Sequence, residues 1–190
     1  MIRLTDFLFS ILLLLILSPI LILVFILCYF DLKSPIFIQQ RVGINLKIFS
    51  LYKFRTMNLE TPNIPSHKVD EIQVTKIGAL LRRSKLDELP QLINVFKGDM
   101  SLVGPRPSLP NQKEVIEERK KLGVLNFKPG ITGLSQINGL DMSKPKLLAE
   151  NDYMMMQKMS FLLYLKVIFL TLIGKGKGDR VKKSKKLDSD

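Results

Sequence analysis

The sequence predicts an α/β protein, mostly helical with a small β-hairpin, that begins with a membrane-associated segment. Residues 7–30 form an apolar run without a single charge, which is typical of a segment in or on a membrane. Residues 35–57 are rich in β-branched and aromatic residues on both sides of a Gly-Ile-Asn turn, as expected for a β-hairpin. Short helical patterns fill most of the chain from there to residue 174, and residues 175–190 form a basic tail.

The composition limits the class of protein. A chain of 190 residues fits one domain of ordinary size, with a core that needs no disulfide or metal. The single cysteine, Cys28, excludes a disulfide framework and favours a reducing compartment. Lys and Arg outnumber Asp and Glu by 29 to 17, so we expect a polyanionic neighbour, which is nucleic acid, anionic lipid or a phosphorylated substrate.

The apolar run is long enough to cross a membrane but is broken at its centre. As one straight helix it would measure roughly 36 Å, against a hydrocarbon core of about 30 Å. Pro19 lies in the middle, where its ring clashes with the carbonyl of Leu15 and leaves that carbonyl without its intrahelical donor. The hydroxyl of Ser18 can serve the freed backbone. We therefore expect a helix, a break at Ser18 and Pro19, and a second helix.

Two membrane paths fit such a broken helix. Each half is only about 17 Å long, which suits entry into one leaflet and return. Basic residues flank both ends, with Arg3 on one side and Lys33 on the other, and basic flanks tend to remain cytoplasmic. A re-entrant hairpin keeps both flanks on one side, whereas a kinked span exports one. Because spanning helices tolerate proline, the residues alone leave both paths open.

Loop and helix patterns follow the predicted hairpin. Residues 58–74 are expected to form a loop, and His67 within it is expected to be solvent-exposed because no Cys or His partner for a metal site lies nearby. Helices are expected at 75–84, 86–98, 108–123, 147–160 and 161–174. The last is apolar, interrupted by Lys166 and too short to span, so we expect a buried or interfacial helix. The tail 175–190 is expected to be disordered, either solvated or drawn to anionic lipid.

Two adjacent carboxylates, Asp87 and Glu88, are the first candidates for chemistry. Asp87 is a fair N-cap for the helix 86–98, in which Pro90 falls in the first turn and Gly98 at the stop. Adjacent acids at a helix start commonly do no more than complement the helix dipole. Arg106 is a second candidate, because Pro105 and Pro107 restrict its backbone on both sides, and a restricted arginine suits phosphate oxygens or a structural salt bridge.

Glycines mark a third stretch, residues 128–140, "KPGITGLSQINGL". Glycines let backbone amides approach a ligand closely, and they also simply make turns. The Met cluster at 154–156 and 159 is expected to pack in the core or against lipid rather than to form a cofactor site.

Four runs in this order resemble the bacterial sugar transferase family, and more narrowly its small monotopic phosphoglycosyl transferases. The runs are "FIQQRVG", "LYKFRTM", "KLDELPQLINVFKGDMSLVGPRP" and "KPGITGLSQING", after an N-terminal hydrophobic segment. The resemblance extends from Arg3 to about Ile173. It implies an enzyme that moves a sugar phosphate from a nucleotide diphosphate sugar, usually a UDP-sugar, to polyprenyl phosphate, with release of UMP.

The resemblance also implies roles for individual residues. Asp87 would be a nucleophile that forms an acyl-phosphate sugar intermediate, and Glu88 would help to hold Mg²⁺, which prefers carboxylate and phosphate oxygens. The substrate-binding residues are expected to be Arg41, Lys53, Arg55 and Arg106. The family's membrane segment is a re-entrant hairpin broken at Ser-Pro, which matches Ser18 and Pro19 and favours the re-entrant path.

The resulting hypothesis has three segments: a re-entrant hairpin over residues 1–30, a cytoplasmic catalytic domain over 31–174 and the basic tail. Its location would be the cytoplasmic face of the bacterial inner membrane, with the nucleotide sugar, the polyprenyl phosphate and anionic lipids as partners. A nucleic-acid binder is disfavoured because the aromatic residues do not interleave with basic ones as stacking platforms would.

One departure from the family pattern bears on activity. Leu140 stands where the family commonly has an arginine after Asn-Gly, which removes one expected anion contact, and Lys144 or Lys146 are candidate replacements. The departure suggests an alternative function, a membrane-anchored binding or scaffold protein that does not turn substrate over.

Overall fold

The N-terminal segment forms two helices that meet at a sharp bend. The computed structural model describes residues 2–61 and 73–175, with α1 at Ile2–Ile16 and α2 at Ser18–Leu32. The two helices are bent by 65°, and only together do they reach the length and apolar composition needed to cross a membrane. The Ser18 hydroxyl donates to the Leu15 carbonyl over 2.8 Å. The predicted break is therefore confirmed, while the re-entrant path stays a prediction.

The predicted β-hairpin is also confirmed. Strands β1 (Ile36–Val42) and β2 (Ile48–Phe54) pair antiparallel, in a register that joins Ile36 to Phe54 and Val42 to Ile48. The turn between them, η1 (Ile44–Leu46), places Asn45 in the left-handed region at φ 51°, a conformation that asparagine tolerates better than most residues.

A second sheet was missed by the sequence analysis. Strands β3 (Ser101–Val103) and β4 (Gly130–Thr132) pair in parallel, although no strand was predicted at either stretch. Each strand has only three residues and is followed by glycine. Three residues are too few to show the apolar–polar alternation by which a strand is recognised.

The helices follow the predicted positions with shifted ends. They are α3 (Lys76–Ser84), η4 (Leu86–Glu88), α4 (Gln91–Lys97), α5 (Lys113–Lys121), η5 (Val124–Asn126), α6 (Leu134–Ile137), α7 (Pro145–Gln157) and α8 (Phe161–Leu172). The helix expected over 108–123 begins only at Lys113, because the Gln112 side chain accepts from the Leu109 N–H and holds a turn ahead of it.

The expected helix over 86–98 is wrong in one respect. Its first residues form the separate 3₁₀ turn η4, α4 begins at Gln91, and Asp87 therefore does not cap it. Lys85 has a left-handed backbone at φ 60°, which ends α3 and redirects the chain into η4. The predicted stop at Gly98 is confirmed, since Gly98 ends α4 at φ 92°.

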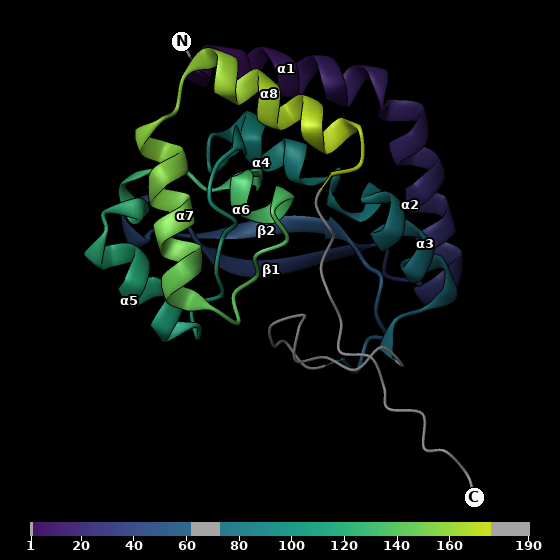
Figure 1. The fold of residues 1–190 in the computed structure, drawn as a ribbon. Coiled ribbons are helices and arrows are strands. Elements are labelled where there is room, and N and C mark those ends of the chain that lie inside the picture. The colour runs from purple at the N-terminus through teal and green to yellow at the C-terminus, as the bar shows by residue number, and fades with distance from the viewer. Residues whose placement is uncertain (1, 62–72, 176–190) are drawn as a thin grey trace, which may run out of the picture.

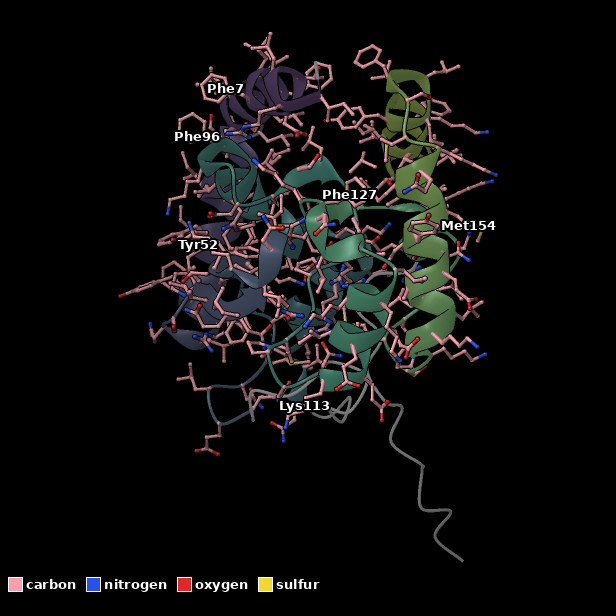
Figure 2. All side chains as sticks on the ribbon, turned by 90° about the vertical axis from the view of Figure 1, so that its left-hand side faces the viewer. Phe7, Tyr52, Phe96, Lys113, Phe127 and Met154 are labelled. Carbon is pink, nitrogen blue, oxygen red and sulfur yellow. The ribbon has the colours of Figure 1, made fainter. Side chains whose placement is uncertain are left out.

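Helix α4 joins the N-terminal helix pair to the hairpin (Figure 1). The fully buried Asn94 donates to the Ser50 carbonyl and accepts from the Tyr52 N–H, which fixes α4 against β2. On its other side, Phe96 stacks on Phe7 of α1 with ring centroids 5.4 Å apart (Figure 2). Of the Met cluster, Met155 is buried in the core between these elements and Met154 is exposed (Figure 2).

Helix α1 is also tied to the rest of the protein by polar contacts. Asp6, 2% exposed, accepts hydrogen bonds from the Ser101 hydroxyl, the Leu102 N–H and the Tyr164 hydroxyl of α8. Arg3 donates to the Val95 carbonyl at the end of α4. Large apolar side chains are exposed on α1, α2 and α8, including Leu15, Phe30 and Leu172. Exposed apolar surface of this extent suits an apolar environment.

Two predictions lie outside the described residues. His67 is one, and the tail beyond residue 175 is the other.

Candidate active site

The two candidate carboxylates lie in η4, between α3 and α4. Asp87 is 5% exposed and Glu88 is 9% exposed, so neither is an ordinary surface acid. The Glu88 N–H donates to the Lys85 carbonyl and the Leu89 N–H to the Leu86 carbonyl, which closes the turn. Because the left-handed Lys85 comes just before it, this turn leaves the α3 axis and carries both acids into the protein interior.

Glu88 is held by two cations. Its Oε1 lies 2.7 Å from Arg106 Nη2 and 3.1 Å from Lys53 Nζ. All three side chains are at most 22% exposed, and charge-assisted hydrogen bonds are stronger in such surroundings than at the surface. The structure thus brings together three of the residues that the sequence singled out, from β2, η4 and the loop after β3.

The backbone beside Arg106 is clamped from two sides. Arg41, 7% exposed, donates from Nη1 to the Pro107 carbonyl over 2.9 Å and from Nη2 to the Gln39 side chain. Arg119 of α5 donates from Nη1 to the carbonyl of Arg106 itself over 2.7 Å. Arg41 therefore supports the loop that presents Arg106.

Arg119 is anchored in turn by a buried acid. Asp152 of α7 lies 2.6 Å from Arg119 Nη2, with side-chain exposures of 0% and 3%, and also accepts from the Ser135 hydroxyl over 2.7 Å. Sequence reasoning missed both residues. Their spacing nevertheless places both residues on buried helix faces. Arg119 follows the buried Val115 by four residues, and Asp152 lies between the buried Leu148 and Met155 at helical spacing. A charge on the buried face of a helix indicates a buried partner.

Glycines bring the Arg106 loop against the glycine-containing stretch 128–140. Gly104 donates to the Thr132 carbonyl over 2.8 Å, and Gly130 donates to the Pro105 carbonyl over 2.9 Å. A Cβ on Gly130 would lie 2.0 Å from the Gly104 nitrogen, and one on Gly104 would lie 2.5 Å from the Lys128 carbonyl oxygen. These glycines permit two backbones to meet, and that contact positions the loop.

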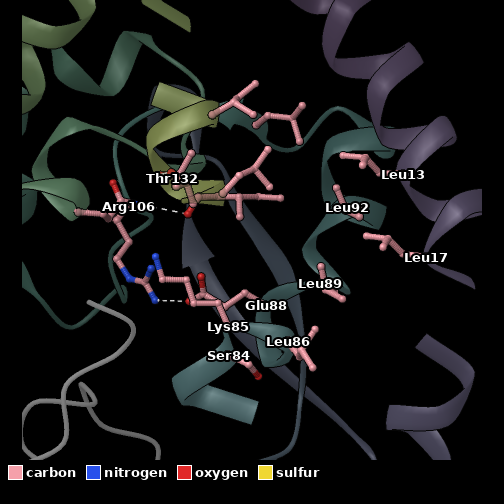
Figure 3. A pocket seen from close by; sticks show the side chains of 16 residues that line it. Leu13, Leu17, Ser84, Lys85, Leu86, Glu88, Leu89, Leu92, Arg106 and Thr132 are labelled. Carbon is pink, nitrogen blue, oxygen red and sulfur yellow. Dashed lines mark hydrogen bonds and ion pairs between the residues drawn. The ribbon is translucent and has the colours of Figure 1, made fainter. Parts of the chain in front are cut away.

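A pocket of about 300 Å³ opens beside this cluster (Figure 3). Leucines from α1, η4 and the start of α4 form one wall, and α8 contributes apolar residues to another. The polar end holds Glu88, Arg106 and Lys85. The lining residues are Leu13, Leu17, Ser84, Lys85, Leu86, Glu88, Leu89, Leu92, Leu102, Arg106, Ile131, Thr132, Gln136, Ile168, Thr171 and Leu172. Leu17 directly precedes Ser18 and Pro19, so the bend between α1 and α2 borders the pocket.

Asp87 and Arg55 are not among the residues that line this pocket. Asp87 is buried in the same turn as Glu88, η4. Arg55 donates to the Ser34 and Ile36 carbonyls and lies over the Phe37 ring. Arg55 thus holds the junction between α2 and β1, and a role in substrate binding stays a prediction.

Leu140 and its candidate replacements lie away from the pocket lining. The Leu140 N–H donates to the Ser135 carbonyl over 2.9 Å, and Lys144 and Lys146 are exposed. The two lysines are not among the residues that line the pocket.

A divalent cation would need donors beyond the protein. Within residues 2–61 and 73–175, no group of three or more His, Cys, Asp or Glu residues is arranged to hold a metal ion. The adjacent carboxylates of Asp87 and Glu88 still fit Mg²⁺, which usually binds through one or two carboxylates and completes its shell with substrate phosphates and water.

Comparison with known proteins gives a consistent result. The family model for bacterial sugar transferases matches residues 1–176. An uncharacterized sugar transferase, EpsL of Bacillus subtilis (strain 168), is 45% identical over 140 residues, which cover 73% of this chain and 69% of the relative. The exopolysaccharide production protein PSS of Rhizobium leguminosarum bv. phaseoli is 33% identical over 195 residues, covering 93% of this chain and 96% of its own length.

Longer relatives match as well. The undecaprenyl-phosphate glucose phosphotransferase of Komagataeibacter xylinus is 37% identical over 187 residues, which cover 90% of this chain but 35% of the relative. The chain therefore spans about a third of the length of that relative.

Proposed function

The chain belongs to the bacterial sugar transferase family, and from that premise we propose that it transfers a sugar phosphate from a nucleotide diphosphate sugar to undecaprenyl phosphate. The donor is a UDP-sugar, the released product is UMP, and the lipid-linked sugar starts the synthesis of a surface glycan. Relatives named for transfer to undecaprenyl phosphate support the acceptor.

The observation that carries this proposal is a pocket with one apolar end and one charged end. One end is lined by leucines beside the membrane-helix break, and the other by Arg106 and Glu88. A polyprenyl phosphate has the same division, with an apolar chain that prefers lipid-like surroundings and a phosphate that prefers cations. The acceptor can therefore enter along the exposed apolar side of α1 and α8 and place its phosphate beside the dyad.

In the first step, a carboxylate oxygen of Asp87 attacks the phosphorus that carries the sugar. The bond from that phosphorus to the bridging oxygen of the diphosphate breaks, and UMP leaves with the bridging oxygen and its electron pair. A carboxylate approaches a doubly anionic diphosphate only when cations lower the negative charge. Lys53 and Arg106 supply that charge from fixed positions, since both are already paired with Glu88.

In the second step, a phosphate oxygen of the acceptor attacks the same phosphorus. The acyl-phosphate bond breaks, the Asp87 carboxylate is regenerated, and the product is a polyprenyl diphosphate sugar. The covalent step lets the soluble donor product leave before the lipid reacts. Mg²⁺, held by Glu88 and the substrate phosphates, would supply further charge neutralisation.

The same proposal fixes the orientation of the protein. The α1–α2 pair enters and leaves one leaflet at the cytoplasmic face, where the basic flanks remain with the nucleotide sugar. Anionic lipid headgroups attract those flanks.

Release of UMP from UDP-sugars tests the function. The purified protein, given undecaprenyl phosphate and Mg²⁺, is expected to release UMP from at least one UDP-sugar and to form a lipid-linked product. Asp87→Asn should abolish both, whereas Asp141→Asn, a change at an aspartate outside the pocket lining, should retain them. A wild-type protein that binds UDP-sugar without releasing UMP would instead support the binding or scaffold function suggested by Leu140.

A further inference from the structure

We propose that Lys85 binds the phosphate of the lipid acceptor, a role that rests on the proposed function. Lys85 was not among the site residues predicted from the sequence. Lys85 lines the pocket, and Figure 3 shows its side chain extending to the same end of the pocket as Arg106.

The charges at this end of the pocket support an anionic ligand. Lys53 and Arg106 both pair with Glu88, and Lys85 adds a further positive charge at the same end of the pocket. Among the described residues its ammonium group has no acidic partner, and its hydrogen bond goes to the Lys175 backbone carbonyl over 3.1 Å. An ammonium group beside a guanidinium group is stabilised by an anion between them.

The surroundings of Lys85 favour the lipid phosphate over the diphosphate of the donor. Leu86 and Leu89 follow it closely in the chain, and both line the apolar wall of the pocket. Leu13 and Leu17 of the membrane segment complete that wall. A phosphate monoester held by Lys85 therefore has room for an attached isoprenoid chain beside it, whereas a nucleoside diphosphate would place polar groups against leucines.

The backbone of Lys85 gives its side chain a fixed starting point. With φ 60° and ψ 14° it forms the bend between α3 and η4, one residue before the turn that carries Asp87. A cation on this bend moves with the dyad, so an acceptor phosphate bound to it is held at a constant place relative to the nucleophile.

Lys85 has one competing role that the test must separate. Its hydrogen bond to Lys175 joins the bend to the end of α8, whose Ile168, Thr171 and Leu172 line the pocket. A purely structural link needs a hydrogen-bond donor but no charge. Lys85→Gln keeps a donor and removes the charge, whereas Lys85→Arg keeps the charge. Lys121→Gln removes a charge from the exposed surface of α5 and serves as the matched control.

Steady-state kinetics with undecaprenyl phosphate and a UDP-sugar give the first readout. Loss of one charge-assisted hydrogen bond corresponds to about a 10–100-fold effect. We expect Lys85→Gln to raise the acceptor KM by about that factor, with donor KM within about twofold, and Lys85→Arg to stay within about threefold of wild type. An unchanged acceptor KM in Lys85→Gln, or equal increases in both KM values, would overturn the proposal.

Ligand-dependent thermal stability gives a second readout that does not need turnover. Undecaprenyl phosphate should raise the Tm of the wild type and of Lys121→Gln, and raise it less in Lys85→Gln. Undecaprenol and UDP-sugar should show no dependence on Lys85. If the wild type releases no UMP but this pattern appears, the proposed function fails while the Lys85 assignment stands. Equal stabilisation of wild type and Lys85→Gln by undecaprenyl phosphate contradicts the assignment.

Discussion

Two carboxylate–arginine pairs adjoin the loop that carries Arg106, and they differ in what surrounds them. Asp152 and Arg119 are 0% and 3% exposed in their side chains and are closed off by Ser135. Glu88 and Arg106 are 11% and 22% exposed and line a pocket. The distances are nearly equal, at 2.6 and 2.7 Å, so the two pairs differ in their access to solvent and not in their geometry.

The two pairs are connected through the backbone of the loop that carries Arg106. Arg119 donates to the carbonyl of Arg106, so the closed pair holds the backbone from which the open pair extends. We expect changes in the open pair to affect activity with little loss of stability, and changes in the closed pair to affect stability first.

Glu88→Gln tests the open pair and should have the largest effect. Removing the charge leaves Lys53 and Arg106 without the carboxylate that positions them, and by analogy with other electrostatic groups in active sites we expect turnover to fall by about 10²–10³-fold. Arg106 lines the pocket and is partly exposed, so Tm should fall less than in Asp152→Asn. UMP release and thermal unfolding, measured on the same preparation, check this; a large drop in Tm would make Glu88 a structural residue like Asp152.

Asp152→Asn tests the closed pair. It leaves the Arg119 guanidinium buried without a counter-charge, which costs about 3–5 kcal/mol when one partner of a buried pair is removed. Denaturant unfolding in detergent measures the loss, and Glu150→Gln on the same helix is the control, with little change expected. A variant as stable as the wild type would show that the burial of this pair contributes nothing to the fold.

Arg119→Lys tests the connection between the pairs. Lysine keeps the charge near Asp152 but cannot donate hydrogen bonds to both Asp152 and the Arg106 carbonyl, because it lacks the planar guanidinium group. We expect about a tenfold fall in kcat/KM, with a smaller loss of stability than in Asp152→Asn. Equal losses in the two variants would mean that Arg119 acts only through the fold.

Tyr164→Phe extends the comparison to Asp6, a buried carboxylate whose described partners are neutral donors. Loss of one hydrogen bond to Asp6 should cost about 1 kcal/mol. Burial and Asp6 raise the pKa of Tyr164, so the folded state keeps its proton above pH 10 while the unfolded state loses it. Wild-type stability should therefore be complete below about pH 10 and decline above it.

The pH series needs a control tyrosine. Tyr164→Phe should lack that part of the decline, and Tyr153→Phe, at a partly exposed position of α7, should retain it. Parallel pH dependence of the wild type and Tyr164→Phe would contradict the assignment of Tyr164 as the titrating group.

The sequence was sufficient for features that depend on local patterns. The break at Pro19, the hairpin turn and the stop at Gly98 follow from proline, glycine and β-branched residues at recognisable spacings. The sequence alone also indicated Asp87, Glu88 and Arg106 as candidates, and Glu88 and Arg106 meet as part of one cluster with Lys53.

Features that depend on contacts distant in sequence were missed. β3 and β4 are short strands that exist because two glycines let their loops meet, and neither strand shows a pattern alone. Arg119 and Asp152 come from helices whose charged residues otherwise face solvent. Lys85 falls between two predicted helices, and its place in the pocket depends on a left-handed backbone that a lysine indicates only weakly.

The central claim is that Asp87 becomes covalently bound to the sugar phosphate, and the intact mass of the protein tests it most directly. The protein is incubated with candidate UDP-sugars and Mg²⁺ without lipid acceptor. We predict a mass increase equal to one sugar phosphate, located at Asp87, absent in Asp87→Asn and removed when undecaprenyl phosphate is added. A protein that forms the lipid-linked product without this adduct, or that carries the adduct in Asp87→Asn, would contradict the account.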